Sequence, residues 1–168
     1  MSEPKPGRTL PRTAPNPLFL RDQELTTGVE LLDYAYRALS AEPDRILSNL
    51  GLGRSHRRVL HVVGRQPDVT LADLVDIVRL TKQSLSRVIK ELEARGLLAR
   101  GASQLDRRRR PLRLTPDGKE LEERLNGGLR RRMARAYRAA GADAVAGFHQ
   151  VLLGLVDEPA RRHIAGTG

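Results

Sequence analysis

The sequence predicts a mainly α-helical, single-domain protein that carries one two-stranded β-hairpin. Apolar side chains recur at helical spacing along most of the 168 residues, whereas the short strand-like runs flank a cluster of arginines. Aromatic residues make up only 3% of the chain and tryptophan is absent. The core must therefore be built from leucine, valine, isoleucine and alanine, a composition that favours helices.

The charge of the chain restricts the class of partner. It contains 30 lysines and arginines against 20 acidic residues, a net charge of +10, which favours a polyanion first and an acidic membrane surface second. Cysteine is absent, which excludes a thiol switch. The longest apolar run, Val151 to Val156, is too short to span a bilayer, and the N-terminus shows no secretory signal. A cytoplasmic protein without a membrane partner is expected.

Composition also suggests the domain boundaries. Residues 1–17 hold five of the ten prolines and are predicted to form a flexible basic tail before a single domain over residues 18–168. Two apolar stripes with coiled-coil spacing lie near the ends of that domain, at Leu25, Val29, Leu32, Tyr36 and Leu39 and at Val145, Phe148, Leu152 and Leu155. Each stripe either packs inside the monomer or forms a dimer interface, and the spacing alone does not decide between these alternatives.

Two helices are expected after the first stripe. Pro43 is predicted to open a short helix that closes at Gly51 or Gly53. Ser55 is predicted to cap the next helix, which stops at Gly64.

A pair of short helices follows. Thr70 is predicted to cap the helix "TLADLVDIV", with Asp73 at its third position, and Thr81 to cap the next helix, which Gly96 ends. Two short helices joined by a turn of three or four residues are the helix-turn-helix arrangement.

The second of these helices has two different faces. At about 100° per residue, Leu85, Val88, Ile89 and Leu92 share one side, while Glu91 lies on the opposite side. The candidate DNA-binding side chains of this helix are Thr81, Lys82, Gln83, Ser84, Ser86, Arg87 and Lys90. Arginine and lysine can bond guanine, glutamine can bond adenine, and serine can bond phosphates or bases. Taken alone, this face is as readily explained as a solvated helix surface.

The segment after Gly96 favours DNA binding over a solvated helix surface. Two short strands around "ASQLDRRRR" predict a hairpin, the wing of a winged helix-turn-helix, with Arg107, Arg108, Arg109 and Arg110 at its tip. Phosphates would relieve the repulsion among these arginines, so the run is interpreted as a DNA clamp rather than a solvated loop. Asp106 either pairs with an arginine and shapes the wing or is a simple turn residue. Pro111 is expected at the hairpin edge, because it cannot donate to a sheet.

Thr115 and Pro116 then predict the cap and first residue of a long helix. The segment "NGG", Asn126 to Gly128, should interrupt this helix with a kink or weak point, at a cost of about 1 kcal/mol per glycine. The winged lobe is placed at about residues 45–115, and the dimerisation helices at about 23–42 and 116–165.

An enzyme is not predicted. The chain contains no G-x-S-x-G motif, no glycine-rich phosphate loop and no cysteine nucleophile. No cofactor is expected, and the four histidines lack metal-ligand spacing. The two remaining function classes are a sequence-specific regulator and a non-specific architectural DNA-binding protein.

The segments "TKQSLSRVIKELEARGLLAR", "DRRRRPLRLT" and "TPDG" resemble the MarR family of bacterial transcriptional regulators over about residues 18–165. The wing pattern of that family maps onto Asp106, Arg108, Leu114, Thr115 and Gly118, whereas Pro111 and the run of four arginines depart from it. The segments before residue 66 further resemble a PetP/LdtR-like branch of the family.

This resemblance implies a homodimer, made by the first and last helices, that binds a pseudo-palindromic operator in double-stranded DNA. A repressor is implied more often than an activator. It also implies a small-molecule effector, often aromatic, between the dimerisation region and the DNA-binding lobe. The residues expected to contact this effector are Tyr34, Tyr36, His56, Arg57 and His61. Each is also readily explained as a core or interface residue.

Overall fold

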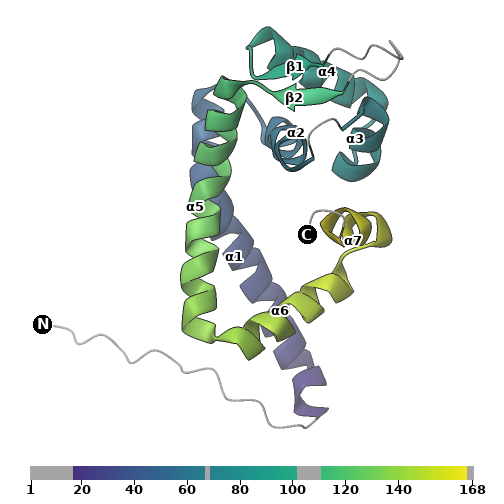
Figure 1. Ribbon diagram of the computed structural model, residues 1–168. Coiled ribbons are helices and arrows are strands. Elements are labelled where there is room, and N and C mark those ends of the chain that lie inside the picture. Colours follow the sequence, from purple (N-terminus) through teal and green to yellow (C-terminus); the bar gives the residue numbers. More distant parts are fainter. Residues whose placement is uncertain (1–16, 67–68, 102–110, 166–168) are drawn as a thin grey trace, which may run out of the picture. The chain divides into compact units, whose positions relative to one another are not determined.

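The computed structural model describes residues 17–66, 69–101 and 111–165 (Figure 1). The predicted mainly helical fold with one two-stranded hairpin is confirmed. In chain order the elements are η1 (Pro17–Leu20), α1 (Asp22–Asn49), α2 (Arg54–Arg65), α3 (Leu71–Val78), α4 (Lys82–Ala94), β1 (Leu98–Arg100), β2 (Leu112–Leu114), α5 (Pro116–Ala140), α6 (Ala142–Leu155) and α7 (Glu158–Ala165). The predicted tail lies outside the described residues up to residue 16.

The chain divides into two compact units, one ending at Ala38 and the other beginning at Leu39. Helix α1 contributes its first part to the first unit and its last part to the second. Among the described helices, none combines the length and the apolar character that a membrane span requires.

The hydrophobic core lies in the second unit, where the end of α1, helices α2 to α4, the hairpin and the start of α5 meet. Its fully buried members include Leu47, Val59, Leu60, Val63, Leu74, Leu85, Ile89, Leu92, Leu112 and Leu125. Burying a side chain of this size contributes about 1.5–3 kcal/mol. This core is what holds the helix-turn-helix against the wing.

Helix α1 passes through Pro43 without a break, so the predicted separate helix is wrong. The helix expected to end near residue 42 continues to Asn49. A proline in a helix interior removes one hydrogen bond and costs about 3 kcal/mol. Here the proline ring is buried beside the core residue Leu47, and this burial offsets part of the cost.

Helix α2 begins after Gly53, so Ser55 is not its cap, and the helix ends at Arg65 rather than Gly64. The cap interaction comes from a residue inside the helix, His56, whose side chain bonds the backbone of Gly53. The backbone N–H of Gly53 donates to Nδ1 of His56 at 3.0 Å, and the backbone N–H of His56 donates to the Gly53 carbonyl at 3.0 Å. A histidine thus takes the role usually given to glutamate or glutamine at this position.

The helix-turn-helix has the predicted caps. Thr70 Oγ1 accepts from the Asp73 backbone N–H at 3.3 Å, and the Asp73 carboxylate accepts from the Thr70 backbone N–H at 3.0 Å. Thr81 Oγ1 accepts from the Ser84 backbone N–H at 3.2 Å. Between the helices, Arg79 adopts a left-handed conformation with φ of 52°, which ends α3 and turns the chain into α4.

Strands β1 and β2 pair antiparallel, with Leu98 opposite Leu114. Pro111 does not prevent this pairing, because it precedes β2 and contributes only its carbonyl oxygen, which accepts from the Gly101 N–H at 2.8 Å. The other side of β2 is also used, since the Leu112 N–H donates to the Val69 carbonyl at 3.0 Å.

Helix α5 begins as predicted, with Thr115 as cap and Pro116 as its first residue. The predicted interruption at "NGG" is wrong, because the helix is continuous from Pro116 to Ala140. Asn126 and Gly127 are buried, and a Cβ on Gly128 would lie 3.0 Å from the carboxylate of Glu42 on α1. A Cβ at Gly127 or Gly128 would meet the carboxylate ends of Glu123 and Glu42, for which the glycines leave room.

Candidate nucleic-acid interface

Helix α4 is fixed by one face and exposes the other. Leu85, Val88, Ile89 and Leu92 are all buried, in agreement with the helical geometry of the sequence. They pack in the core against α2 and α3, so the opposite face of α4 is turned to solvent.

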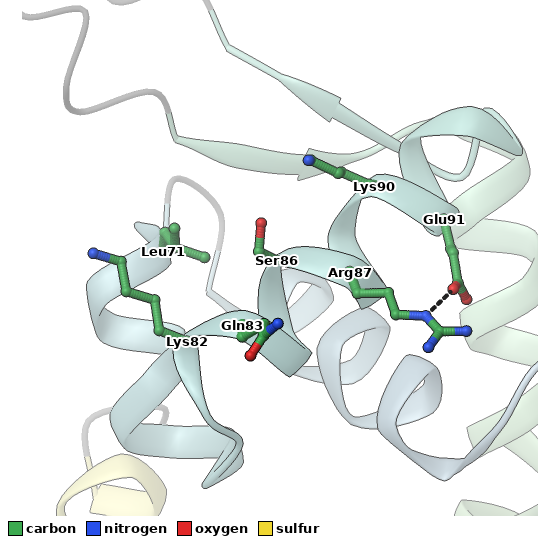
Figure 2. A pocket seen from close by; sticks show the side chains of 7 residues that line it. All are labelled: Leu71, Lys82, Gln83, Ser86, Arg87, Lys90 and Glu91. Carbon is green, nitrogen blue, oxygen red and sulfur yellow. Dashed lines mark hydrogen bonds and ion pairs between the residues drawn. The ribbon is translucent and has the colours of Figure 1, made fainter.

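The exposed face of α4 lines a shallow hollow of about 700 Å³ (Figure 2). Five of the side chains predicted to bind DNA come together in this hollow, with two further residues, Leu71 and Glu91. The lining residues are Leu71, Lys82, Gln83, Ser86, Arg87, Lys90 and Glu91. Thr81 and Ser84 lie beside the hollow, where their hydroxyl groups bond each other at 2.9 Å within the helix cap.

Arg87 carries an ion pair on this face. Its Nε donates to Glu91 Oε1 at 2.9 Å, while His56 Nε2 on α2 lies 2.8 Å from Glu91 Oε2 (Figure 2 draws the first contact). The hydrogen bond from Arg87, and then that from His56, lower the pKa of the Glu91 carboxyl below its ordinary value. Glu91 is therefore ionised at neutral pH. Its i,i+4 spacing from Arg87 was the signal in the sequence that indicates this pair.

The wing is joined to α4 at its base, where Arg100 Nε donates to Glu93 Oε1 at 2.6 Å. This ion pair connects β1 to the helix whose exposed face forms the hollow. The predicted wing-tip residues Asp106 and Arg107 to Arg110 lie outside the described residues.

Three of the five residues predicted to bind an effector lie on α2 and contact neighbouring helices. Besides His56, Arg57 Nε donates to the Asn126 side-chain carbonyl at 3.2 Å, and His61 Nδ1 lies 3.2 Å from the Glu122 carboxylate. These contacts join α2 to α5. Tyr34 and Tyr36 belong to the first unit and are exposed, and the Arg37 guanidinium lies 4.8 Å from the Tyr34 ring centre.

His61 also lines a cavity of about 250 Å³ between α2, α3 and α7. Its walls combine three nitrogen-bearing side chains of α2 with apolar groups. The lining residues are Arg58, His61, Val62, Arg65, Ile77, Val78 and Ile164.

The residues of the two apolar stripes are largely uncovered in the single chain. Val29 is 70% exposed and Leu155 is 66% exposed, and Leu25, Leu32, Tyr36 and Phe148 are also exposed. Leu39, Val145 and Leu152 are half-buried. No residue of α6 is buried, although α6 is rich in apolar side chains.

A helix-turn-helix whose second helix is exposed, followed at once by a hairpin that packs against it, defines a winged helix-turn-helix protein. The sequence profile of the MarR family matches residues 50–109. The HTH-type transcriptional regulator PetP of Rhodobacter capsulatus is 45% identical over 146 residues, which cover 87% of this chain and 88% of that protein. The chain therefore belongs to the MarR family of transcriptional regulators, and the resemblance to its PetP-like branch is confirmed.

Other relatives agree with this assignment. The HTH-type transcriptional repressor Rv2887 of Mycobacterium tuberculosis is 30% identical over 114 residues, 68% of this chain and 82% of that protein. Its structure in complex with salicylic acid matches with a TM-score of 0.52 at 29% identity, over 75% of this chain and 93% of that one. The MarR family regulator SP03579 shares the fold, with a TM-score of 0.66 at 21% identity over 83% and 93% of the two chains.

Proposed function

We propose that this protein is a sequence-specific DNA-binding regulator that acts as a homodimer on a pseudo-palindromic operator, with repression as its mode of action. The observation that carries this proposal is the exposed polar face of α4, anchored from behind by four buried apolar side chains. A helix held in this way can enter the major groove as a rigid element.

Each side chain on this face has a role that its chemistry supports. Arg87, Lys82 and Lys90 offer N–H donors to guanine O6 and N7, and Gln83 can bond adenine through its amide. Ser84 and Ser86 have short hydroxyls suited to phosphates at the groove edge. We assign Asp106 and Arg107 to Arg110 to the wing contact, as the sequence predicts.

Dimerisation is supported by the uncovered apolar stripes. A monomer that left Leu25, Val29 and Leu155 in water would expose a large apolar surface, which is typical of an interaction site. A second copy of the same chain is the partner that completes these stripes. A symmetric dimer presents two α4 helices to half-sites about one helical turn, roughly 34–36 Å, apart.

We also propose that a small-molecule effector regulates DNA binding. The complex of the relative Rv2887 with salicylic acid supports a small organic acid as the ligand class. On α2, we propose His56, Arg57 and His61 as residues that contact the effector, while Tyr34 and Tyr36 stay predictions from the sequence. Salicylic acid is expected to weaken DNA binding, and an unchanged dissociation constant at saturating salicylic acid would show that this acid is not the effector.

The alternative is an architectural DNA-binding protein, which the net charge of +10 favours. Fluorescence anisotropy at physiological salt, on the duplex upstream of the protein's own gene and on a scrambled duplex, separates the two. A preference of about 10³ or more for the upstream duplex supports the regulator. If selection from a random duplex library also enriches no motif, the architectural function is the correct one.

Arg87→Ala is expected to relax the base preference at one position of each half-site. The lost bidentate contact contributes about 1–3 kcal/mol of discrimination. Anisotropy titrations on duplexes with single base changes measure this loss. Arg124→Ala is the matched control, because Arg124 is an exposed arginine on α5 that does not line the α4 hollow. Equal base preference in Arg87→Ala and wild type would contradict the assignment.

Replacing Arg107 to Arg110 with alanine is expected to weaken binding to every sequence to a similar extent. Each lost phosphate contact lowers the slope of log K against log salt by about 0.9. Titrations at several salt concentrations measure that slope. A slope equal to that of wild type would show that the four arginines do not contact phosphates.

A further inference from the structure

Four groups form a continuous chain of hydrogen bonds from the start of α2 to the exposed face of α4. The Gly53 backbone N–H donates to His56 Nδ1 at 3.0 Å. His56 Nε2 lies 2.8 Å from Glu91 Oε2, and Glu91 Oε1 accepts from Arg87 Nε at 2.9 Å. The DNA-binding assignments made above use only the last member of this chain.

The first bond fixes the tautomer of the histidine. A backbone N–H is always a donor, so His56 Nδ1 must be the acceptor and cannot carry a proton in this arrangement. The ring proton then lies on Nε2, which donates it to the Glu91 carboxylate. Gly53 therefore sets the direction of the hydrogen bond that holds Glu91.

Exposure increases along this chain. The His56 side chain is 12% exposed, the Glu91 side chain 38% and the Arg87 side chain 83%. The anchor is therefore in the protein interior, while the guanidinium reaches solvent. Each carboxylate oxygen of Glu91 is held from a different helix, one from α2 and one from α4, which restrains the carboxylate against rotation.

The contact with Glu91 uses Nε of Arg87, which leaves Nη1 and Nη2 available at the end of the guanidinium. These two groups can bond guanine O6 and N7 as a pair. We infer that Glu91 and His56 are specificity-determining positioning residues, which hold Arg87 in the orientation that reads one base of the operator. This inference rests on the proposed function, because it requires α4 to read DNA.

Removal of the Glu91 carboxylate should change the affinity for DNA and the base specificity in opposite directions. Glu91 adds a negative charge to a surface that must approach phosphates, so its removal should raise the affinity for DNA of any sequence. The same removal frees the long side chain of Arg87, which must then lose rotamer freedom on binding a base. A variant without the carboxylate should therefore bind more tightly in general and discriminate less.

The experiment uses the full chain and a random duplex library, from which the wild-type protein selects its preferred sequence. Anisotropy titrations then compare the selected duplex with duplexes changed at single positions and with a scrambled duplex. Wild type is expected to discriminate by about tenfold or more at the guanine bonded by Arg87. Glu91→Gln should reduce this ratio at least threefold at that position alone, with equal or higher affinity for the scrambled duplex.

Two substitutions of the histidine distinguish positioning from folding. His56→Asn keeps an acceptor near the place of Nδ1 and loses the Nε2 donor, so it should lose discrimination while the α2 cap remains. His56→Lys keeps a donor for the Glu91 carboxylate and loses the acceptor, because an ammonium group cannot accept a hydrogen bond. It should lower the melting temperature, because the Gly53 N–H loses its partner, and retain discrimination.

The outcomes separate this inference from the proposed function. If wild type selects a sequence but Glu91→Gln and His56→Asn discriminate as well as wild type does, the inference is overturned and the proposed function stands. It is also overturned if discrimination follows the melting temperature across the variants, because that pattern indicates a structural role. If wild type selects no sequence, the proposed function fails and the inference fails with it.

Discussion

Gly118→Ala is expected to destabilise the winged lobe more than any other single glycine substitution among the described residues. A Cβ at this position would overlap the backbone carbonyl oxygen of Leu97, at the base of the wing. No rotamer change relieves a clash between backbone and Cβ, so β1 or the first turn of α5 must move. We expect a loss of about 3 kcal/mol, at the upper end for overpacking. That loss corresponds to a fall in melting temperature of roughly 6–12 °C.

Thermal unfolding followed by circular dichroism measures this effect. Glu120→Ala is the matched control, because Glu120 lies two residues further along the same helix and is exposed. Substitutions of this kind usually change stability by less than about 0.5 kcal/mol. A melting temperature of Gly118→Ala within 2 °C of that of the control would show that α5 and the wing base separate at little cost.

The double substitution Leu25→Glu with Val29→Glu is expected to abolish the proposed homodimer. Both side chains lie on the apolar stripe of α1, where two carboxylates would have to be buried against a second copy without partners. A monomer holds only one half-site, so the affinity for the full operator should fall by about 10²–10⁴-fold, the usual gain from linking two binding modules. Sedimentation velocity and anisotropy titration together measure the two losses.

Gln23→Glu provides the control for that experiment. It adds a carboxylate to the same helix, but Gln23 lies about 160° around the helix from Leu25 and is exposed. This variant should remain a dimer with wild-type operator affinity. A double variant that still sediments as a dimer would rule out this stripe of α1 as the interface.

Local side-chain chemistry could be predicted from the sequence. The caps at Thr70, Thr81 and Thr115 each use a hydroxyl that accepts from a backbone N–H three residues later, a pattern that neighbouring residues reveal. The two faces of α4 follow from helical periodicity in the same way. The left-handed glycine after α4, Gly96 with φ of 68°, is a third feature of this local kind.

Features that depend on distant parts of the chain could not be predicted. Pro43 and the glycines of "NGG" break helices by local rules, but here α1 and α5 continue through them, and Pro43 is buried. Ser55 is of the residue type that favours a helix cap, but the cap of α2 is the contact of His56 Nδ1 with the Gly53 N–H.

The candidate site also combines features that neighbouring residues reveal with a contact between distant parts of the chain. Sequence periodicity placed Gln83, Arg87 and Glu91 on the exposed face of α4, and the structure agrees. It did not reveal that Glu91 is held from behind by His56, a residue 35 positions earlier in the chain. A contact of this kind depends on how α2 packs against α4, which is a property of the folded core.

The hydrogen bond from the Leu112 N–H to the Val69 carbonyl has a consequence for the dynamics of the lobe. Val69 directly precedes Thr70, the cap of α3, so strand β2 is bonded to β1 on one side and to the entry of the helix-turn-helix on the other. The wing and α3 should therefore open together as one cooperative unit. In native-state hydrogen exchange, the amides of Leu112 and of the core of α3 should then share one opening free energy, instead of the wing exchanging first.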